Sequence, residues 1–186
     1  MGWKELFGFG DKKKVQPEPE SLRDFTLSDL LPGWFADYDL KTWEVTARHY
    51  YDWGGGDLSY EWQLKSHNDT IYLIKESDDE IRWSICRPIP FSRLGEEVRT
   101  YIRTNEDPPE EIVFDGITYY LEEFGGGHFF KNCTGSGEEF LSWDYEDDSG
   151  EKLLCIEQWG EEEFEVSVGE PVEEYQFTNI LPRSVS

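Results

Sequence analysis

The sequence has few of the residues on which metal sites and disulfide frameworks depend. Its 186 residues include only three cysteines and three histidines. Cys86, Cys133 and Cys155 are odd in number, and none of them forms the C-x-x-C spacing of zinc and redox sites. We therefore expect reduced thiols without disulfides, with Cys86 and Cys155 buried in apolar strand patterns. We expect no cofactor.

Positive charge is also scarce. The chain has 17 Lys and Arg against 41 Asp and Glu, and the excess is largest in residues 106–186, with 22 acidic and three basic residues. Phosphate backbones and anionic lipid surfaces require a basic footprint, so nucleic acid and anionic membranes are disfavoured as partners. The acidic surface favours a basic protein partner, although a solvated face or adaptation to high salt explains the same charge.

Long apolar runs are missing, since no segment approaches the ~20 residues of a transmembrane helix. No secretory signal pattern opens the chain, so a cytoplasmic protein is expected. Residues 1–24 join a short amphipathic piece to a Pro/Glu-rich stretch and are expected to form a flexible arm and linker.

Residues 25–186 have the pattern of one all-β domain. Helical elements are expected only at 25–32 and 94–103. The predicted strands are rich in β-branched and aromatic residues, and several alternate polar with apolar side chains. They include WEVTARHYY, YEWQL, TIYLIKE, IRWSICRPI, ITYYLEEF, HFFKN, EFLSWDY, KLLCIEQW and FEVSVGEPV.

An internal repeat relates residues 38–89 to residues 114–172. YDLKTW aligns with FDGITY, EWQL with SWDY, and HYY with HFF, which makes His49 and His128 equivalent. One β-meander leaves an apolar face and two edges uncovered. We therefore expect the two antiparallel meanders to form one pseudo-symmetric sandwich or barrel-like domain.

The acidic segment DYEDDSGE raises the question of a metal loop. Asp144, Glu146 and Asp148 have the spacing of the first three ligands of a calcium loop. Position 6 is Ser149 where the loop needs Gly, and position 12 is Cys155 where it needs Glu. A solvated hairpin turn is therefore predicted, and weak divalent binding is the alternative.

Other motifs of known chemistry are absent from the sequence. The segments YDWGGGDL and EFGGGHFF match no phosphate-binding pattern and are predicted to be flexible hairpin turns. No nucleophile elbow is present, so we predict no catalytic activity. An enzyme built on dispersed carboxylates would need a concave pocket that holds a strongly perturbed acid.

Four residues are candidates for ligand binding. Trp53 and Trp159 lie beside predicted turns, where an exposed aromatic platform for a glycan or small ligand is conceivable. His49 and His128 would approach each other if the repeats meet at a shared cleft, although two histidines without a third ligand are a poor metal set.

The order of these segments resembles a known family. HYYDW, YEWQL, SHND, TIYLIKE, SDDE and IRWSICRPI, followed in the second copy by FLSWDY, CIEQWGEEEFEVSVGEPV and YQFTNILP, resemble the bacterial domain of unknown function 4178 over residues 33–182. The resemblance implies an accessory role, linked to membrane-stress or polyamine-related systems, and no site residues.

The hypothesis that leads at this point is a non-catalytic cytoplasmic interaction module that binds a basic protein surface. The alternative is a β module that binds a small ligand or glycan through exposed Trp residues beside the Gly-rich loops.

Overall fold

A computed structural model describes residues 25–77 and 80–183. The arm predicted for residues 1–24 lies outside this range. The described residues contain one α-helix, α1 (Glu96–Asn105), and eleven strands, with short 3-10 turns between them. The strands are β1 (Phe35–Tyr38), β2 (Lys41–Gly54), β3 (Asp57–Ser66), β4 (Asp69–Ser77), β5 (Ile81–Ile89), β6 (Glu111–Phe114), β7 (Ile117–Phe130), β8 (Glu138–Asp147), β9 (Leu153–Gly160), β10 (Glu163–Val172) and β11 (Thr178–Leu181).

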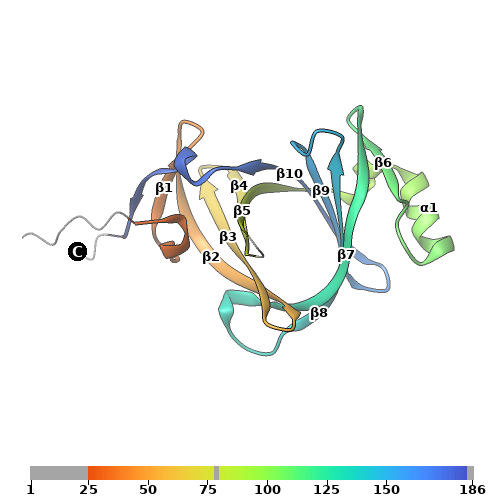
Figure 1. The fold of residues 1–186 in the computed structure, drawn as a ribbon, viewed down its shortest axis with the longest axis horizontal. Coiled ribbons are helices and arrows are strands. Elements are labelled where there is room, and N and C mark those ends of the chain that lie inside the picture. Colours follow the sequence, from red (N-terminus) through yellow and green to blue (C-terminus); the bar gives the residue numbers. More distant parts are fainter. Residues whose placement is uncertain (1–24, 78–79, 184–186) are drawn as a thin grey trace, which may run out of the picture.

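The strands form one antiparallel sheet that closes on itself. Their order is β11-β1-β2-β3-β4-β5-β10-β9-β8-β7-β6, and an additional pairing of β2 with β7 joins the ends of the central eight strands into a barrel. Figure 1 looks through this ring, with β1 on one side and β6 and α1 on the other. The predicted all-β, barrel-like fold is confirmed.

The register of the strands shows how the repeat is built. The β2–β3 pairing has an irregularity between Val45 and Ala47, and the β7–β8 pairing has one between Leu121 and Glu123. These β-bulges shift the strand by one residue, so the side chains that follow change face. The two bulges occupy equivalent positions in the repeat. In each copy, the second residue pair after the bulge contains the equivalent tryptophan, Trp62 or Trp143.

Two seams join the copies. At one, β2 pairs with β7 and Asp52 lies opposite His128; at the other, β5 pairs with β10 and Arg87 lies opposite Val168. Counted from the bulges, Asp52 and His128 are each other's counterparts in the repeat. A pseudo-two-fold axis therefore passes through this pair.

The apolar cores lie outside the barrel rather than inside it. A first core packs the outer face of β2 to β5 against η1 (Leu27–Asp29), β1 and Phe177, and includes Trp43, Val45, Trp62, Leu64, Ile71, Leu73 and Ile85. A second core packs the outer face of β7 to β10 against α1 and β6, and includes Val98, Ile102, Ile112, Phe114, Tyr119, Trp143, Tyr145, Leu154, Ile156 and Val166. The apolar face of each copy is therefore covered from outside the barrel, and the interior of the barrel is left to the alternate, more polar residues.

One predicted turn is in fact strand. EFGGGHFF lies within β7, and YDWGGGDL forms the β2–β3 hairpin as predicted. A Cβ on Gly127 would lie 2.7 Å from the backbone oxygen of Asp52, so glycine is needed where β2 crosses close to β7. A Cβ on Gly125 would meet the Trp53 ring at 3.7 Å.

The predicted helices are confirmed with changed bounds. The segment 94–103 forms α1 at Glu96–Asn105, and 25–32 contains only the 3-10 turn η1. In η1 the Asp29 carboxylate accepts hydrogen bonds from the backbone N–H and hydroxyl of Thr26, each at 2.9 Å. Pro32 follows soon after and prevents a longer helix.

Candidate functional site

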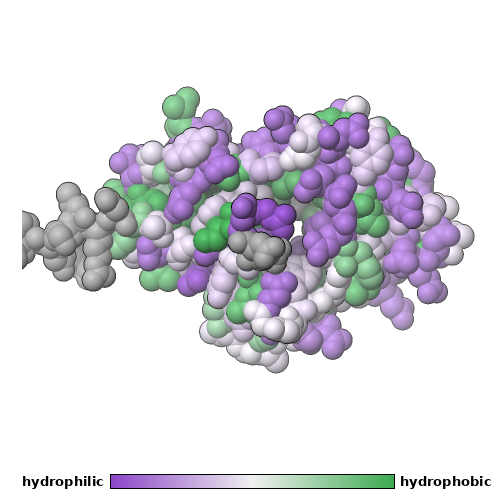
Figure 2. Space-filling view, viewed as in Figure 1, coloured by the Kyte–Doolittle hydropathy of each residue, from purple (hydrophilic) through white to green (hydrophobic). Residues whose placement is uncertain are grey.

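The lumen of the barrel is a cavity of about 830 Å³. Its walls are the residues that alternate with the outer cores, such as Glu61 and Gln63 around Trp62, and Cys155 and Glu157 around Ile156. Figure 2, viewed as Figure 1, shows hydrophilic side chains above and to the right of the middle of this face, with hydrophobic side chains to its left. The cavity is thus a direct result of strand alternation in a closed sheet.

One part of the lumen is an aromatic cluster. The Phe140 ring contacts both Trp53 and Trp159, with centroids at 5.1 and 5.0 Å. Phe129 contacts Trp159 at 5.4 Å and Tyr51 at 5.0 Å. Trp53 and Trp159, predicted beside turns as an exposed platform, are brought together here as half-buried walls of the cavity. The indole N–H of Trp53 donates to Ser59 at 2.9 Å.

Carboxyl groups line the lumen next to these rings. Glu61 is 9% exposed and accepts a hydrogen bond of 3.0 Å from the Tyr51 hydroxyl. Burial raises the pKa of Glu61 to about 7, although the bond from Tyr51 opposes the shift. Glu61 therefore carries a proton for much of the time near neutral pH.

Glu157 lies close to the same group. Burial raises its pKa to about 8, the negative charges of Glu61, Glu165 and Asp144 add to the rise, and the nearby Tyr51 hydroxyl opposes it. The two carboxyl groups thus converge on one phenol hydroxyl and discourage each other's ionisation.

Acidic side chains outnumber basic ones in the lumen, where Arg82 pairs with Glu76. Ten carboxylates line the cavity, against two basic side chains, Arg82 and Lys131. Within residues 25–77 and 80–183, no ion pair includes Glu61, Asp144 or Glu157. An opposite charge would lower these pKa values, so their rise reflects the missing counter-charge as well as burial.

The third inner carboxylate, Asp144, meets a thiol. Ser142 donates to Asp144 at 3.1 Å and lies 3.4 Å from the Cys155 sulfur. Burial, together with the charge of Asp144, raises the pKa of the Cys155 thiol well above its usual value, and burial raises that of Cys86 to about 12. Both thiols therefore stay protonated and unreactive, since the thiolate is the nucleophile.

The two histidines have different surroundings. His49 is buried, lines the lumen, and its Nδ1 accepts a hydrogen bond of 2.8 Å from the backbone N–H of Asn132. Burial and the charge of Lys131 lower its pKa, which favours the neutral ring. His128 is exposed, with Nε2 3.7 Å from Glu139. The predicted equivalence is wrong, because the registers make Gly125 the counterpart of His49 and Asp52 that of His128.

The acidic segment DYEDDSGE comprises the end of β8 and the turn that leads to β9. The Asp147 carboxylate accepts hydrogen bonds from the backbone N–H groups of Glu151 and Lys152, both at 3.0 Å. Asp144 faces the lumen, Asp148 is exposed, and the described part of the chain has no group of three or more His, Cys, Asp or Glu able to hold a metal ion. Asp144, Glu146 and Asp148 are therefore spread over a strand and a turn, and they do not surround a single point where a metal ion could bind.

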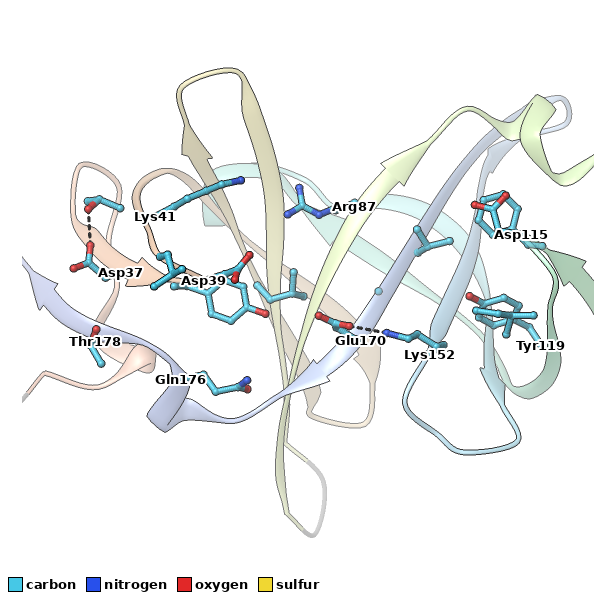
Figure 3. A pocket seen from close by; sticks show the side chains of 18 residues that line it. Asp37, Asp39, Lys41, Arg87, Asp115, Tyr119, Lys152, Glu170, Gln176 and Thr178 are labelled. Atoms are coloured by element: carbon cyan, nitrogen blue, oxygen red, sulfur yellow. Dashed lines mark hydrogen bonds and ion pairs between the residues drawn. The ribbon is translucent and has the colours of Figure 1, made fainter.

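A second cavity, of about 1120 Å³, is a groove outside the β5–β10 seam. Asp39 and Asp115 lie on opposite sides of it, in the corresponding turns before β2 and β7, with Arg87 and Glu170 between them (Figure 3). Its basic groups are paired: Lys41 and Arg87 with Asp69, and Lys152 with Glu170 at 2.8 Å. Because these charges already have partners, the lumen is the better candidate.

Sequence reasoning missed Glu61 and Glu157 as site residues. Both stand in strands next to an apolar core residue, at Glu61-Trp62 and Ile156-Glu157. That alternation is also what a solvent-exposed strand face has, so a charged residue inside a barrel could not be recognised before closure of the sheet was known.

The comparisons with known proteins identify the family of the chain. None of the helices in the described residues is long and apolar enough to cross a membrane. The chain is similar to an uncharacterized protein of Aquifex aeolicus (strain VF5), with 29% identity over an alignment of 192 residues that covers 98% of this chain and all of that protein. No solved structure matches it. The model of the domain of unknown function DUF4178 matches residues 31–174. By that match over most of its length, the chain belongs to the DUF4178 family.

Proposed function

We propose that the protein is a non-catalytic module that binds a small molecule in the lumen of its barrel. The observation that carries the proposal is the cavity of about 830 Å³, lined by aromatic rings and by three inner carboxyl groups, Glu61, Asp144 and Glu157, that belong to no ion pair of the described residues. Ligand cavities commonly measure roughly 300–1000 Å³, and eight-stranded barrels are wide enough for one small ligand.

The lumen also has an unmatched donor. The indole nitrogen of Trp159 is fully buried and has no hydrogen-bond partner among the described residues. A buried donor without an acceptor costs about 1–3 kcal/mol. The atom is closed even to water, so an oxygen of a bound molecule would bond it only after the Trp159 ring turned toward the cavity.

The acids of the lumen suit binding better than catalysis. Acid–base catalysis by two carboxyl groups needs one that is protonated and one that is ionised, so that their pKa values are pushed apart. Here the pKa values of both Glu61 and Glu157 are raised, to about 7 and about 8. An enzyme built on carboxyl groups would also need a pocket that holds an acid with a strongly shifted pKa, and the lumen is such a pocket. A test of the binding function therefore uses variants as well as ligands.

The proposal is tested with a panel of anionic, neutral and cationic small molecules, scored by thermal shift and by fluorescence of the lumen tryptophans. Gly125→Leu serves as an obstructing variant, because its Cβ meets only ordinary contacts beside Trp53. Phe124→Leu, on the exposed outer face of the same strand, is its matched control. We expect at least one class to bind, with binding lost in Gly125→Leu and kept in Phe124→Leu. Binding that is as tight in Gly125→Leu as in the native chain, or no binding of any class of molecule, would contradict the proposal.

A second candidate function is association with a basic protein. Phe124 and Leu141 are exposed side by side on β7 and β8, where Phe124 stacks on Trp143 at 5.4 Å. The acidic hairpin Glu161–Glu163 lies in the same half of the chain. A partner retained from host lysate at low salt and lost at high salt, by the native chain but not by Phe124→Asp, would support this function.

A further inference from the structure

We propose that the ligand of the lumen is an organic cation: an ammonium group that sits between Glu61 and Glu157, on an apolar body that lies against the aromatic cluster. This inference rests on the proposed binding function and adds the chemical class of the ligand.

The position of the ammonium group follows from the convergence of two carboxyl groups. Glu61 accepts a hydrogen bond from Tyr51 at 3.0 Å, and Glu157 lies within reach of the same hydroxyl. An ammonium group has three donors and no acceptor, which matches acceptors that approach from several sides. Charge-assisted hydrogen bonds of this kind are about twice as strong as neutral ones.

The charge of the cavity selects against other classes. Ten lining carboxylates against two basic side chains repel carboxylates and phosphates. A neutral sugar would leave the inner acids without a counter-charge. A cationic ligand supplies the positive charge that these acids lack, because no ion pair of the described residues includes Glu61, Asp144 or Glu157.

The aromatic cluster selects an organic cation over a metal ion. Tyr51 joins both parts of the site, since its hydroxyl bonds Glu61 and its ring lies 5.9 Å from the Trp53 ring. Aromatic faces attract ammonium groups and cover the attached carbon chain. Metal ions need several ligands round one point, and the described residues hold no group of three or more that would supply them.

Binding of such a cation releases protons. The titratable groups that face the two glutamates come from every wall of the lumen: His49 and Tyr51 on β2, Tyr72 on β4, Cys86 on β5, Glu123 on β7, Asp144 on β8, Cys155 on β9 and Glu165 on β10. Burial raises the pKa of Glu61 to about 7 and that of Glu157 to about 8, so these two groups supply the exchanged protons. Apparent affinity then rises with pH by up to about tenfold per unit for each proton released, between about pH 6 and 8.

The test uses three probes of one length: hexylammonium, 1-hexanol and hexanoate, titrated into the full chain by calorimetry at pH 6, 7 and 8. We expect hexylammonium to bind at least about tenfold more tightly than 1-hexanol at pH 8, and hexanoate not to bind. Repeating the titration in buffers of different ionisation enthalpy measures proton release directly. An alkylammonium has a pKa of about 10.4, so it stays charged throughout.

Variants assign the effect to the two glutamates. Glu61→Gln and Glu157→Gln should each weaken hexylammonium by about tenfold or more and reduce its pH dependence, while 1-hexanol is unchanged. Glu111→Gln, an exposed glutamate on β6, is the matched control and should behave as the native chain. Circular dichroism confirms that each variant folds.

The outcomes separate the two proposals. If 1-hexanol or hexanoate binds as tightly as hexylammonium and Gly125→Leu blocks it, the lumen binds small molecules but the cationic class is wrong. If hexylammonium binds equally well to Glu61→Gln and Glu157→Gln, the assignment to these residues is wrong. If none of the probes binds, the inference is overturned, and the broader panel alone then decides on the lumen.

Discussion

At the scale of the residue, one chemical group behaves in two ways according to its neighbours. On the surface, the pKa values of Asp37 and Asp147 are lowered by hydrogen bonds from Thr42 and Ser149, respectively. In the lumen, burial raises those of Glu61 and Glu157 to about 7 and about 8. The wall of the barrel removes water without supplying donors or cations in its place, so the neutral acid is favoured.

The stability of the protein should therefore depend on Glu61. The pKa of Glu61 is 4.5 when unperturbed and about 7 in the fold, so the folded state loses stability as pH rises from about 4.5 through 7. Glu61→Gln should raise the free energy of unfolding by about 1–3 kcal/mol at pH 9 and change it little at pH 5. Urea unfolding followed by tryptophan fluorescence at both pH values measures this. An equal effect at the two pH values, or the same gain in Glu111→Gln, would argue against the buried carboxyl as the cause.

At the scale of the element, β7 shows why a strand contains three successive glycines. Its neighbours on both sides approach closely: β2 along the seam and β8 along the full ladder. Gly127 leaves room for the backbone of Asp52, and Gly125 lies against the Trp53 ring. Glycine weakens a strand by its entropy, yet here it allows the seam to close and the aromatic rings to enter the lumen.

The two glycines should respond differently to a methyl group. In Gly127→Ala the new Cβ would lie 2.7 Å from the Asp52 backbone oxygen, which cannot move without opening the β2–β7 seam. We expect a loss of about 1–3 kcal/mol in the free energy of unfolding. Gly125→Ala, with its nearest contact at 3.7 Å, should be neutral or slightly stabilising. Chemical denaturation of both variants measures the difference, and equal losses would contradict the close approach at Gly127.

At the scale of the whole molecule, the barrel is held by cores on its outside. The first core lies against η1 and β1, and the second against α1 and β6. Neither half is a separate sheet, because the β2–β7 and β5–β10 seams continue the hydrogen-bonded ladder between them. This arrangement leaves the lumen free of the packing that fills most small barrels.

The continuous ladder predicts that the two cores unfold together. Ile71→Ala in the first core and Ile156→Ala in the second each remove a side chain that is fully buried. Each should cost about 2–5 kcal/mol and leave a single transition. Coincident unfolding curves from tryptophan fluorescence and far-UV circular dichroism would confirm it. Two separate transitions in either variant would show instead that the halves are independent.

The sequence by itself determined the strands, the duplication and the all-β class, because aromatic and β-branched residues at period two are a local signal. The position of Trp53 and Trp159 beside turns made them candidates for ligand binding, and the repeat made His49 one, but neither signal could place them inside a cavity. It failed where the decisive neighbour is distant in sequence. Gly125 to Gly127 were predicted as a turn, because the need for glycine there comes from the close approach of β2, which is distant in sequence. His128 was matched to His49, because the bulges that follow Val45 and Leu121 cannot be recognised from the sequence.

Only the tertiary structure decided which face of each strand is inside. An alternating strand has one apolar and one polar face, and the usual expectation buries the apolar one against the other copy. Here the flanking helix and short strands cover the apolar faces from outside, so closure turned Glu61, Asp144 and Glu157 inward. The candidate site exists because the outer cores stabilise the fold and closure of the ring then encloses the polar face.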